Sequence, residues 1–157
     1  MRVLAKTKDM GREEWLNLRR KGIGGSEAGA ICGLGTFSTP FSVWADKLGL
    51  IPEKEDTERL RQGRDLEEYV AKRFCEETGK KVRHKKVMLQ HDEHDFMIAD
   101  IDREIVGEQA GLECKITTSL NLKKFKNGEY PDQYYAQCMH YMAVTGWKKW
   151  YLAILVL

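Results

Sequence analysis

Apolar residues recur at helical spacing through the first half of the chain, and capping residues mark the ends of each stretch. Ser26 and Thr39 are expected caps, with Pro40 at the first helical position after Thr39. The pattern predicts four helices, within residues 11–22, 26–32, 39–49 and 57–78. Gly79 follows the last of them and predicts its end.

After Gly79 the apolar residues recur in short runs that are typical of β-strands. Strands are expected within residues 80–90, 95–106, 111–118 and 147–157, with a helix between residues 131 and 146. The turn-like residues 106–111 predict an antiparallel hairpin between the second and third of these strands. The predicted fold class is therefore α/β (α+β), with a central mixed β-sheet flanked by helices.

The length of 157 residues suits one domain with a sizeable core, and a single domain over residues 1–157 is expected. The sequence stops on the apolar stretch Leu152–Leu157 without a polar tail. An exposed apolar strand is prone to unwanted pairing. We therefore expect the natural protein to continue with at least one more strand, so that this chain is a fragment or a truncated form.

Composition argues against several classes of protein. The chain is 42% hydrophobic and 32% charged, which is typical of a globular protein. It has neither an apolar run long enough for a membrane span nor a signal peptide, so a cytoplasmic location is expected. Its four cysteines are scattered without a CxxC pair, which argues against a zinc ribbon or a local iron–sulfur motif.

The net charge of +2 neither requires nor excludes a nucleic-acid partner, so the distribution of charge matters more. Basic residues cluster at positions 19–21, 80–86 and 123–126. Any one of these clusters is explained by a solvated surface. Three of them in a small chain are compatible with a surface that binds phosphates.

The stretch GLECKITTS places Glu113 and Lys115 two residues apart in an apolar, β-prone run. In a strand these two side chains share a face and lie side by side. Another carboxylate, Glu67, falls on the apolar stripe of the helix predicted over residues 57–78, whereas Glu68 points about 100° away from it. Taken alone, each buried charge is explained by a salt bridge.

Considered together, these charged residues suggest a metal site. Asp102 belongs to the strand expected to pair with that of Glu113 and Lys115, and Asp100 shares its strand face. The carboxylates of Asp102, Glu113 and Glu67 would raise one another's pKa unless a divalent cation lay between them. An oxygen-rich ligand set favours Mg²⁺ or Mn²⁺. Such an ion, with Lys115 beside it, suits activation of water for phosphodiester hydrolysis.

Several motifs occur in an order that points to a known family. Asp102, Glu113 and Lys115 form a D…ExK pattern, and GRDLEEYVAKRFCEETGKKV holds Glu67. Residues 15–49, WLNLRRKGIGGSEAGAICGLGTFSTPFSVWADKLG, precede them, and QCMHY follows. This series resembles the YqaJ-type phage recombinases, relatives of lambda exonuclease in the PD-(D/E)xK nuclease superfamily. QCMHY is similar to the QxxxY element of RecB-like nucleases.

The resemblance implies roles for the residues of the D…ExK pattern. Asp102 and Glu113 would hold a metal ion together with the backbone carbonyl of Cys114. Glu67 would be a ligand of a second metal ion, and Lys115 would position or activate the attacking water. The implied cofactor is Mg²⁺, with Mn²⁺ as the alternative.

Further roles follow from the same resemblance. Arg19 and Ser26 would grip the 5′-phosphate of the degraded strand, which suits an Arg fork and a hydroxyl beside backbone N–H groups. Arg20 is the alternative to Arg19, and Ser26 is equally explained as a plain helix cap. Gln137 would orient water or contact DNA, and Tyr141 would pack beneath the site or bond the lysine. Helix packing explains both of the latter nearly as well.

The chain also departs from the pattern of the family. Arg103 stands directly after Asp102, where relatives often carry glycine, and Asp100 competes with Asp102 for the catalytic position. The family match favours Asp102. Trp15 and Trp44 are expected in the core.

The expected function is that of a metal-dependent 5′→3′ exonuclease acting on double-stranded DNA ends. It would leave 3′ single-stranded tails for a phage-type annealing protein, in a bacterial host or phage-infected cell. Ring-shaped trimers occur in the family, so a homotrimer is a possible assembly. The alternatives are another PD-(D/E)xK nuclease, either a RecB-like single-strand exonuclease or an endonuclease, and a catalytically silent DNA-binding module.

Overall fold

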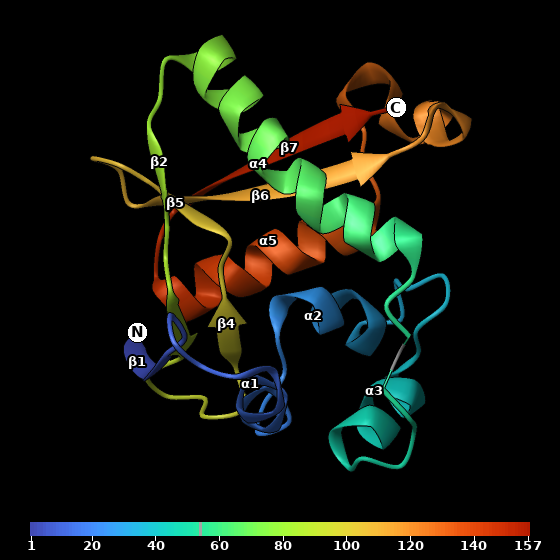
Figure 1. Ribbon diagram of the computed structural model, residues 1–157, viewed down its shortest axis with the longest axis vertical. Helices are drawn as coiled ribbons and strands as arrows, with labels where there is room; N and C mark the ends of the chain where they lie inside the picture. Colours follow the sequence, from blue (N-terminus) through green and yellow to red (C-terminus); the bar gives the residue numbers. More distant parts are fainter. Residues whose placement is uncertain (54) are drawn as a thin grey trace. The chain divides into compact units, whose positions relative to one another are not determined.

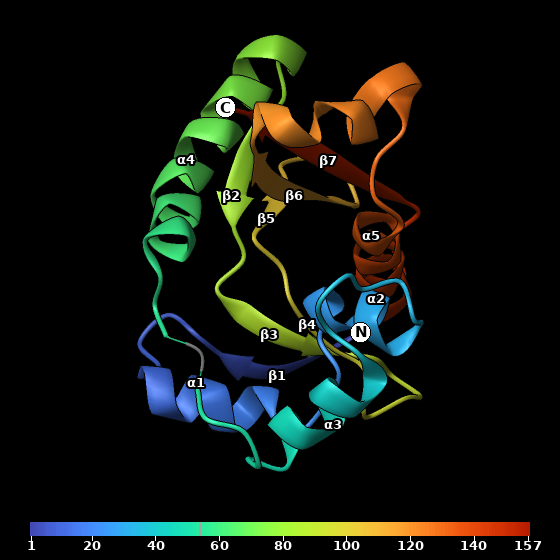
Figure 2. The same ribbon diagram turned by 90° about the vertical axis from the view of Figure 1, so that its right-hand side faces the viewer.

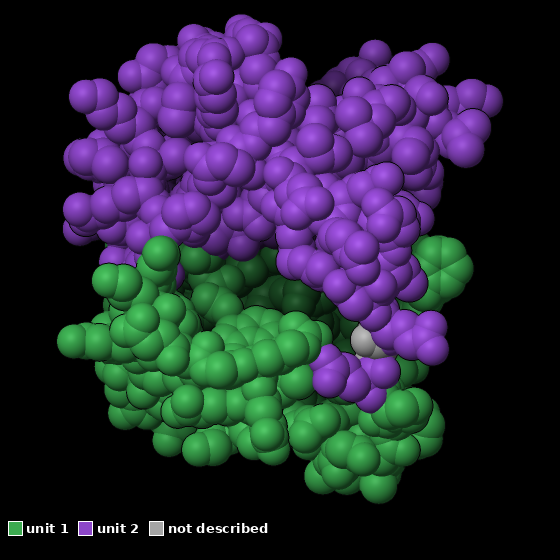
Figure 3. Space-filling model, viewed as in Figure 1, with its two compact units in different colours: residues 1–52, 86–101, 131–147 green, residues 53–85, 102–130, 148–157 purple. Residues whose placement is uncertain are grey.

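The computed structural model describes residues 1–53 and 55–157. The chain forms two compact units, coloured separately in Figure 3. Unit 1 contains residues 1–52, 86–101 and 131–147, and unit 2 contains residues 53–85, 102–130 and 148–157. Each unit is thus built from three separate stretches of the chain. The expectation of a single domain over residues 1–157 stays a prediction.

Unit 1 combines a small antiparallel sheet with four helices. The sheet has the strand order β1 (Arg2–Lys6), β3 (Val87–Gln90), β4 (Ile98–Asp100). The helices are α1 (Arg12–Arg19), α2 (Gly25–Ile31), α3 (Pro40–Lys47) and α5 (Asp132–Thr145). Helix α2 packs along α5, as Figure 1 shows.

The contact between α2 and α5 is close because α2 presents glycines to α5. A Cβ atom on Gly25 would lie 2.6 Å from Cζ of Tyr141, and one on Gly29 would lie 2.9 Å from Cβ of Gln133. Both distances are far below ordinary van der Waals contact. The glycines at the start and middle of this short helix therefore serve helix packing.

Unit 2 contains a mixed sheet covered by a long helix. The sheet has the strand order β2 (Val82–His84), β5 (Arg103–Ile105), β6 (Ala110–Thr117), β7 (Lys149–Val156). Strands β6 and β7 are parallel and the other pairs are antiparallel. Helix α4 (Glu58–Thr78) lies across β6 and β7 (Figures 1 and 2). The buried core between them contains Val70, Ala71, Ile105, Ala110, Leu112 and Cys114. The predicted α+β class with a mixed sheet is confirmed.

The ends of the helices follow the capping signals closely. Thr39 caps α3, with its hydroxyl accepting from Ser42, and Pro40 is the first helical residue. The hydroxyl of Thr57 accepts from Leu60 at the start of α4. Gly79 and Gly146 end α4 and α5 in the left-handed conformation, with φ of 71° and 72°. The predicted cap at Thr39 and the predicted helix ends at Gly79 and Gly146 are confirmed.

Two of the expected strands are each divided between the two units. Residues 80–90 form β2 in unit 2 and β3 in unit 1, and residues 95–106 form β4 in unit 1 and β5 in unit 2. Only β5 pairs with β6 as the predicted hairpin. Neither crossing contains a glycine or proline, so the sequence has no turn signal that marks where the chain leaves a sheet. Strand β1 and the 3₁₀ segment η1 (Ser119–Gly128) were not predicted.

Two predictions about individual side chains are wrong. Helix α2 begins at Gly25 with Gly24 as its cap, so Ser26 lies within the first turn. The Glu27 carboxylate accepts the Gly24 N–H at 2.8 Å and takes over part of the capping. Trp44 is half exposed, at 51%, and the buried residues of α3 are its two neighbours Val43 and Ala45.

In the described ranges, no helix combines the length and the apolar character needed to cross a membrane.

Candidate active site

The predicted pair on the third expected strand is an ion pair on β6. Lys115 Nζ lies 2.7 Å from Glu113 Oε1, and the Glu113 side chain is only 5% exposed. The two residues face the same side because they are two apart in a strand. In the parallel register they stand beside Leu152 and Ile154 of β7. A buried carboxylate and an adjacent lysine are therefore held on rigid backbone in the middle of the sheet.

Asp102 lies one residue before β5, next to this pair. The antiparallel register joins Arg103 to Leu112, and continuing it by one residue brings Asp102 opposite Glu113. Burial, together with the negative charges of Glu113 and Glu67, raises the pKa of Asp102 to about 8. Lys115 and a hydrogen bond from the backbone of Cys114 act in the opposite direction. The hairpin thus brings two carboxylates together, with a third close enough to act on their ionisation.

Glu67 is held on α4 by an arginine from the sheet. The guanidinium of Arg103 pairs with Glu67 and, through Nη2, with Glu68 Oε2 at 2.8 Å. Glu67 is 30% exposed and Glu68 is 76% exposed, which agrees with the predicted difference in their directions. Arg103 itself is buried, with a side chain only 3% exposed.

The donor chemistry of this cluster suits a hard divalent cation. Asp102, Glu113 and Glu67 offer only oxygen atoms, and their mutual repulsion is what a cation would relieve. Among the residues that the structure describes, no three His, Cys, Asp or Glu side chains are arranged as a metal cluster. The reason is visible in the pairing, since Glu67 is turned to Arg103 and Glu113 to Lys115.

Asp100, the competing aspartate, lies in unit 1. Its Oδ2 accepts a hydrogen bond from Trp15 Nε1 at 2.8 Å. Burial raises the pKa of Asp100, and the bond from Trp15 opposes that increase. The backbone crosses from one unit to the other between Ile101 and Asp102, so the two aspartates enter different environments.

The residues predicted to hold a 5′-phosphate gather in unit 1. Arg19 Nη2 lies 3.4 Å from Ser26 Oγ and 3.1 Å from Glu27 Oε1. The guanidinium also lies 5.0 Å from the centre of the Trp15 ring. Arg20 is exposed, whereas Arg19 is partly buried in these contacts.

Glu27 and Lys47 were missed by the sequence reasoning. Lys47 Nζ lies 2.8 Å from Glu27 Oε1 and donates to the Arg19 carbonyl at 2.8 Å. The Glu27 carboxylate therefore pairs with two basic side chains, Arg19 and Lys47, and also accepts the Gly24 N–H at the start of α2. The signal for Glu27 was its spacing of three residues from the cap at Gly24, but Lys47 comes from another helix and leaves no local pattern.

Gln137 and Tyr141 are buried neighbours on α5 in unit 1. Gln137 Nε2 donates to Tyr141 Oη at 2.9 Å, and Tyr141 Oη donates to the Asp100 carbonyl at 3.5 Å. The Tyr141 ring also fills the space left by Gly25. Packing and hydrogen bonding within unit 1 thus account for both side chains, and their roles toward water or DNA stay predictions.

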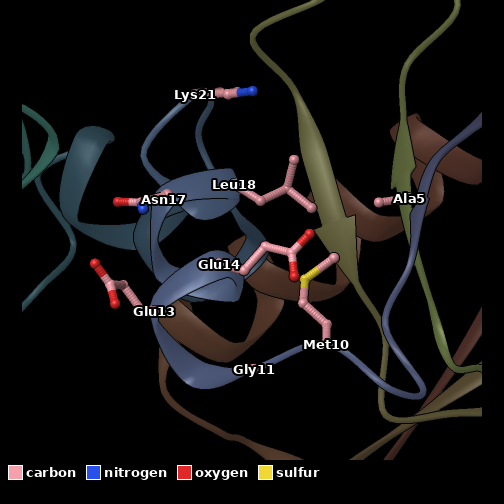
Figure 4. Close-up of a pocket in the computed structure, with 8 residues that line it drawn as sticks. All are labelled: Ala5, Met10, Gly11, Glu13, Glu14, Asn17, Leu18 and Lys21. Atoms are coloured by element: carbon pink, nitrogen blue, oxygen red, sulfur yellow. The ribbon is translucent and has the colours of Figure 1, made fainter.

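A pocket of about 520 Å³ lies beside α1 in unit 1 and contains none of the predicted site residues. Figure 4 shows Glu14 and Leu18 projecting from α1 toward the side on which Ala5 lies. Met10 and Lys21 also line it. The carboxylates that could perform chemistry lie just before β5, on β6 and on α4 instead, so we do not regard this pocket as the active site.

The chain shares its α+β fold with solved exonuclease structures. The chain is similar to the crystal structure of an alkaline exonuclease (LHK-Exo) from Laribacter hongkongensis, with a TM-score of 0.71 and 20% identity over 92% of this chain and 74% of that one. A second structure, LHK-Exo in complex with dAMP, gives a TM-score of 0.64 with 20% identity over 86% and 69% of the two chains. At this level of identity the likeness establishes the fold.

Sequence similarity gives the family. The model of the YqaJ-like viral recombinase domain matches residues 14–148, and the chain belongs to that family. It is also 49% identical over 157 residues to "Uncharacterized protein YqaJ" of Bacillus subtilis (strain 168), covering 98% of this chain and 49% of that protein. The chain thus spans about half the length of this curated relative. The predicted family is confirmed.

Proposed function

We propose that the chain carries the nuclease of a metal-dependent 5′→3′ exonuclease that degrades double-stranded DNA from its ends. The 3′ single-stranded tails would serve phage-type recombination. Membership in a viral recombinase domain family and the fold of an alkaline exonuclease support the general class. The observation that carries the proposal is the position of Asp102 opposite Glu113, with Lys115 paired to the same glutamate.

Asp102, Glu113 and the backbone carbonyl of Cys114 would hold a divalent ion, Mg²⁺ or Mn²⁺. By the resemblance to the family, Glu67 would be the ligand of a second ion, a role with which its ion pair to Arg103 competes. A bound ion would neutralise charge that develops on the phosphoryl oxygens and lower the pKa of water. The raised pKa of Asp102 supports this assignment, because a cation would favour the ionised form that burial and its neighbours disfavour.

Lys115 would position the attacking water as an ammonium or, once it has itself lost a proton, accept the proton that the water gives up. Its Nζ is held 2.7 Å from Glu113, and its side chain is 23% exposed, so the ammonium is fixed but accessible. A positioned cation beside a scissile phosphate also offsets the negative charge of the substrate. The carboxylate and the lysine lie on one strand, which limits their relative movement.

Arg19 and Ser26 would bind the 5′-phosphate of the strand that is degraded. A guanidinium offers two parallel N–H groups to phosphate oxygens, and the Ser26 hydroxyl lies in the first turn of α2. The known complex of LHK-Exo with dAMP supports a substrate made of deoxynucleotides. Gln137 would help to orient water, and Tyr141 would support it through their hydrogen bond.

The proposal extends to partners and location. The substrate would be ends of double-stranded DNA, and a single-strand annealing protein would take up the product. A homotrimer around DNA would make degradation processive. The site of action would be the cytoplasm of a bacterial host or phage-infected cell.

The proposal is tested with a linear duplex that carries a 5′-phosphate and an end label. Wild-type protein with Mg²⁺ should release mononucleotides from the 5′ ends, and EDTA or Lys115→Ala should abolish the release. Lys148→Ala changes an exposed lysine and should leave the rate unchanged. Degradation that persists in EDTA and in Lys115→Ala would refute the metal-nuclease assignment. Cleavage of covalently closed circular DNA would instead favour an endonuclease.

A further inference from the structure

One buried charge in unit 2 has no role in the proposed reaction. The Arg103 side chain is 3% exposed, although arginine is seldom buried unless it is paired. It follows Asp102 directly, at the start of β5. The guanidinium therefore belongs to the residue next to a candidate ligand of the metal ion.

Each terminal nitrogen of Arg103 has a partner on α4. Nη1 pairs with Glu67, and Nη2 lies 2.8 Å from Glu68 Oε2. Nη2 also lies 3.4 Å from His84 Nε2 on β2, and Nη1 lies 4.0 Å from Cys114 Sγ on β6. The guanidinium thus binds two adjacent glutamates through separate nitrogens while it touches three elements of unit 2.

Removal of a charge from water is unfavourable, and it is tolerated when hydrogen bonds and an opposite charge compensate for it. Arg103 and Glu67 compensate one another in this way. A divalent ion bound by Glu67 would have to break this pair and would then face a buried guanidinium of the same sign. The Glu67 carboxylate is accordingly already paired with a positive charge, the guanidinium of Arg103.

We propose that Arg103 takes the place of a second divalent cation at Glu67, so that the chain binds one divalent ion, between Asp102 and Glu113. This rests on the proposed function, because it requires the metal site formed by those two carboxylates. Arg103 is then a positioning residue. It holds Glu67 away from the ion and fixes α4 to β5.

The stoichiometry of Mn²⁺ binding, measured without DNA by the electron paramagnetic resonance of free Mn²⁺, tests the proposal. Wild-type protein should bind one ion per chain. Arg103→Gln releases Glu67 and should bind two. The double variant Arg103→Gln/Glu67→Gln should return to one. Arg83→Gln, which removes an exposed arginine paired with Glu104, is the matched control and should bind one.

A second variant serves if Arg103→Gln does not fold, as judged by circular dichroism. Glu67→Gln keeps the Arg103–Glu68 pair. It should leave the Kd for Mn²⁺ unchanged within about twofold, whereas loss of a ligand would raise the Kd about tenfold or more. An increase of that size would overturn the proposal.

The remaining outcomes separate this inference from the proposed function. Two ions bound to the wild type, or one ion bound to folded Arg103→Gln, would overturn the role of Arg103 and leave the metal nuclease intact. Wild-type protein that binds no Mn²⁺ would overturn both.

Discussion

Trp15 Nε1 donates a hydrogen bond to Asp100 Oδ2, 2.8 Å away, within unit 1. Two residues later the chain reaches Asp102, which lies in unit 2 and is acted on by the charges of Glu113 and Glu67. The two aspartates that local pattern did not separate therefore have different surroundings. Asp100 serves the packing of α1 in this arrangement, and Asp102 is the candidate ligand.

Because of this difference, the same change of aspartate to asparagine should have a large effect on activity at Asp102 and a small one at Asp100. Asp102→Asn should lower the rate of duplex degradation about 100-fold or more, because a charged ligand of the proposed ion is lost. Asp100→Asn should retain most of the activity. Asp100→Ala should lower the free energy of unfolding by about 1–3 kcal/mol, because the partly buried Trp15 N–H loses its acceptor.

Rates on an end-labelled duplex and urea unfolding of each variant provide the measurements. Equal loss of activity in well-folded Asp100→Asn and Asp102→Asn would contradict the assignment of Asp102.

Stability of the metal-free protein should depend on pH through Asp102. Its pKa rises from 3.8 to about 8 on folding, so the folded state binds more protons than the unfolded chain within that window. The contribution of Asp102 to the free energy of unfolding therefore falls as the pH rises from about 4 to about 8. Melting temperatures in EDTA should decline less steeply with pH in Asp102→Asn than in the wild type.

The same linkage predicts how metal acts. Because a divalent ion binds the ionised carboxylate, Mg²⁺ or Mn²⁺ should raise the melting temperature more at pH 8 than at pH 5. If the melting temperatures of wild type and Asp102→Asn in EDTA changed equally with pH, the pKa of Asp102 would not be raised by folding.

The two neighbouring arginines should differ in their effect on substrate preference. Arg19→Ala should reduce the preference for 5′-phosphorylated over 5′-hydroxyl ends about 10-fold or more, because a charge-assisted contact to phosphate is worth about 1.5–3 kcal/mol. Arg20→Ala is the matched control, since Arg20 is exposed, and it should keep the preference. Competition between the two kinds of duplex end provides the measurement.

Glu27→Gln extends this comparison. It removes the carboxylate that Arg19 and Lys47 share, so the phosphate preference should change while degradation of 5′-hydroxyl ends is retained. A preference that depends on Arg20 and not on Arg19 would refute the assignment.

Two glycine-to-alanine changes should act in opposite directions. Gly25→Ala places a methyl group against the Tyr141 ring and should cost about 1–3 kcal/mol of stability through overpacking. Gly63 lies inside α4, and a Cβ atom added there would meet no neighbouring atom within 4 Å. Gly63→Ala should therefore stabilise the protein by about 0.5–1 kcal/mol. Urea unfolding measures both. If Gly25→Ala left the free energy of unfolding unchanged, α2 and α5 would pack less closely than described.

Much of the fold could be predicted because its signals are local. Thr39, Gly79 and Gly146 mark helix ends by backbone chemistry that depends on a few adjacent residues. The Glu113–Lys115 pair follows from the period of a strand. The α+β class and the β5–β6 hairpin could be inferred for the same reason.

The remainder depends on partners distant in the sequence. Arg103 was noticed only as a departure from the family pattern, because its contacts to Glu67 lie 36 positions away. Lys47 reaches Glu27 from another helix. The strand at residues 95–106 divides where unit 1 gives way to unit 2, and this depends on which sheet each half joins. Neither periodicity nor capping carries that information.

The interleaving of the two units has a consequence for how the chain acquires its structure. Strand β1 pairs with β3, whose residues come more than 80 positions later, and β6 pairs with β7 from the far end of the sequence. Early contacts of this kind must close long loops, which slows folding. During synthesis, the first 52 residues would leave the ribosome well before their partners. The carboxylate cluster would not reach its final setting until β5 and β6 had been made, whereas the contacts of Arg19 with Ser26 and Glu27 lie within the first 52 residues.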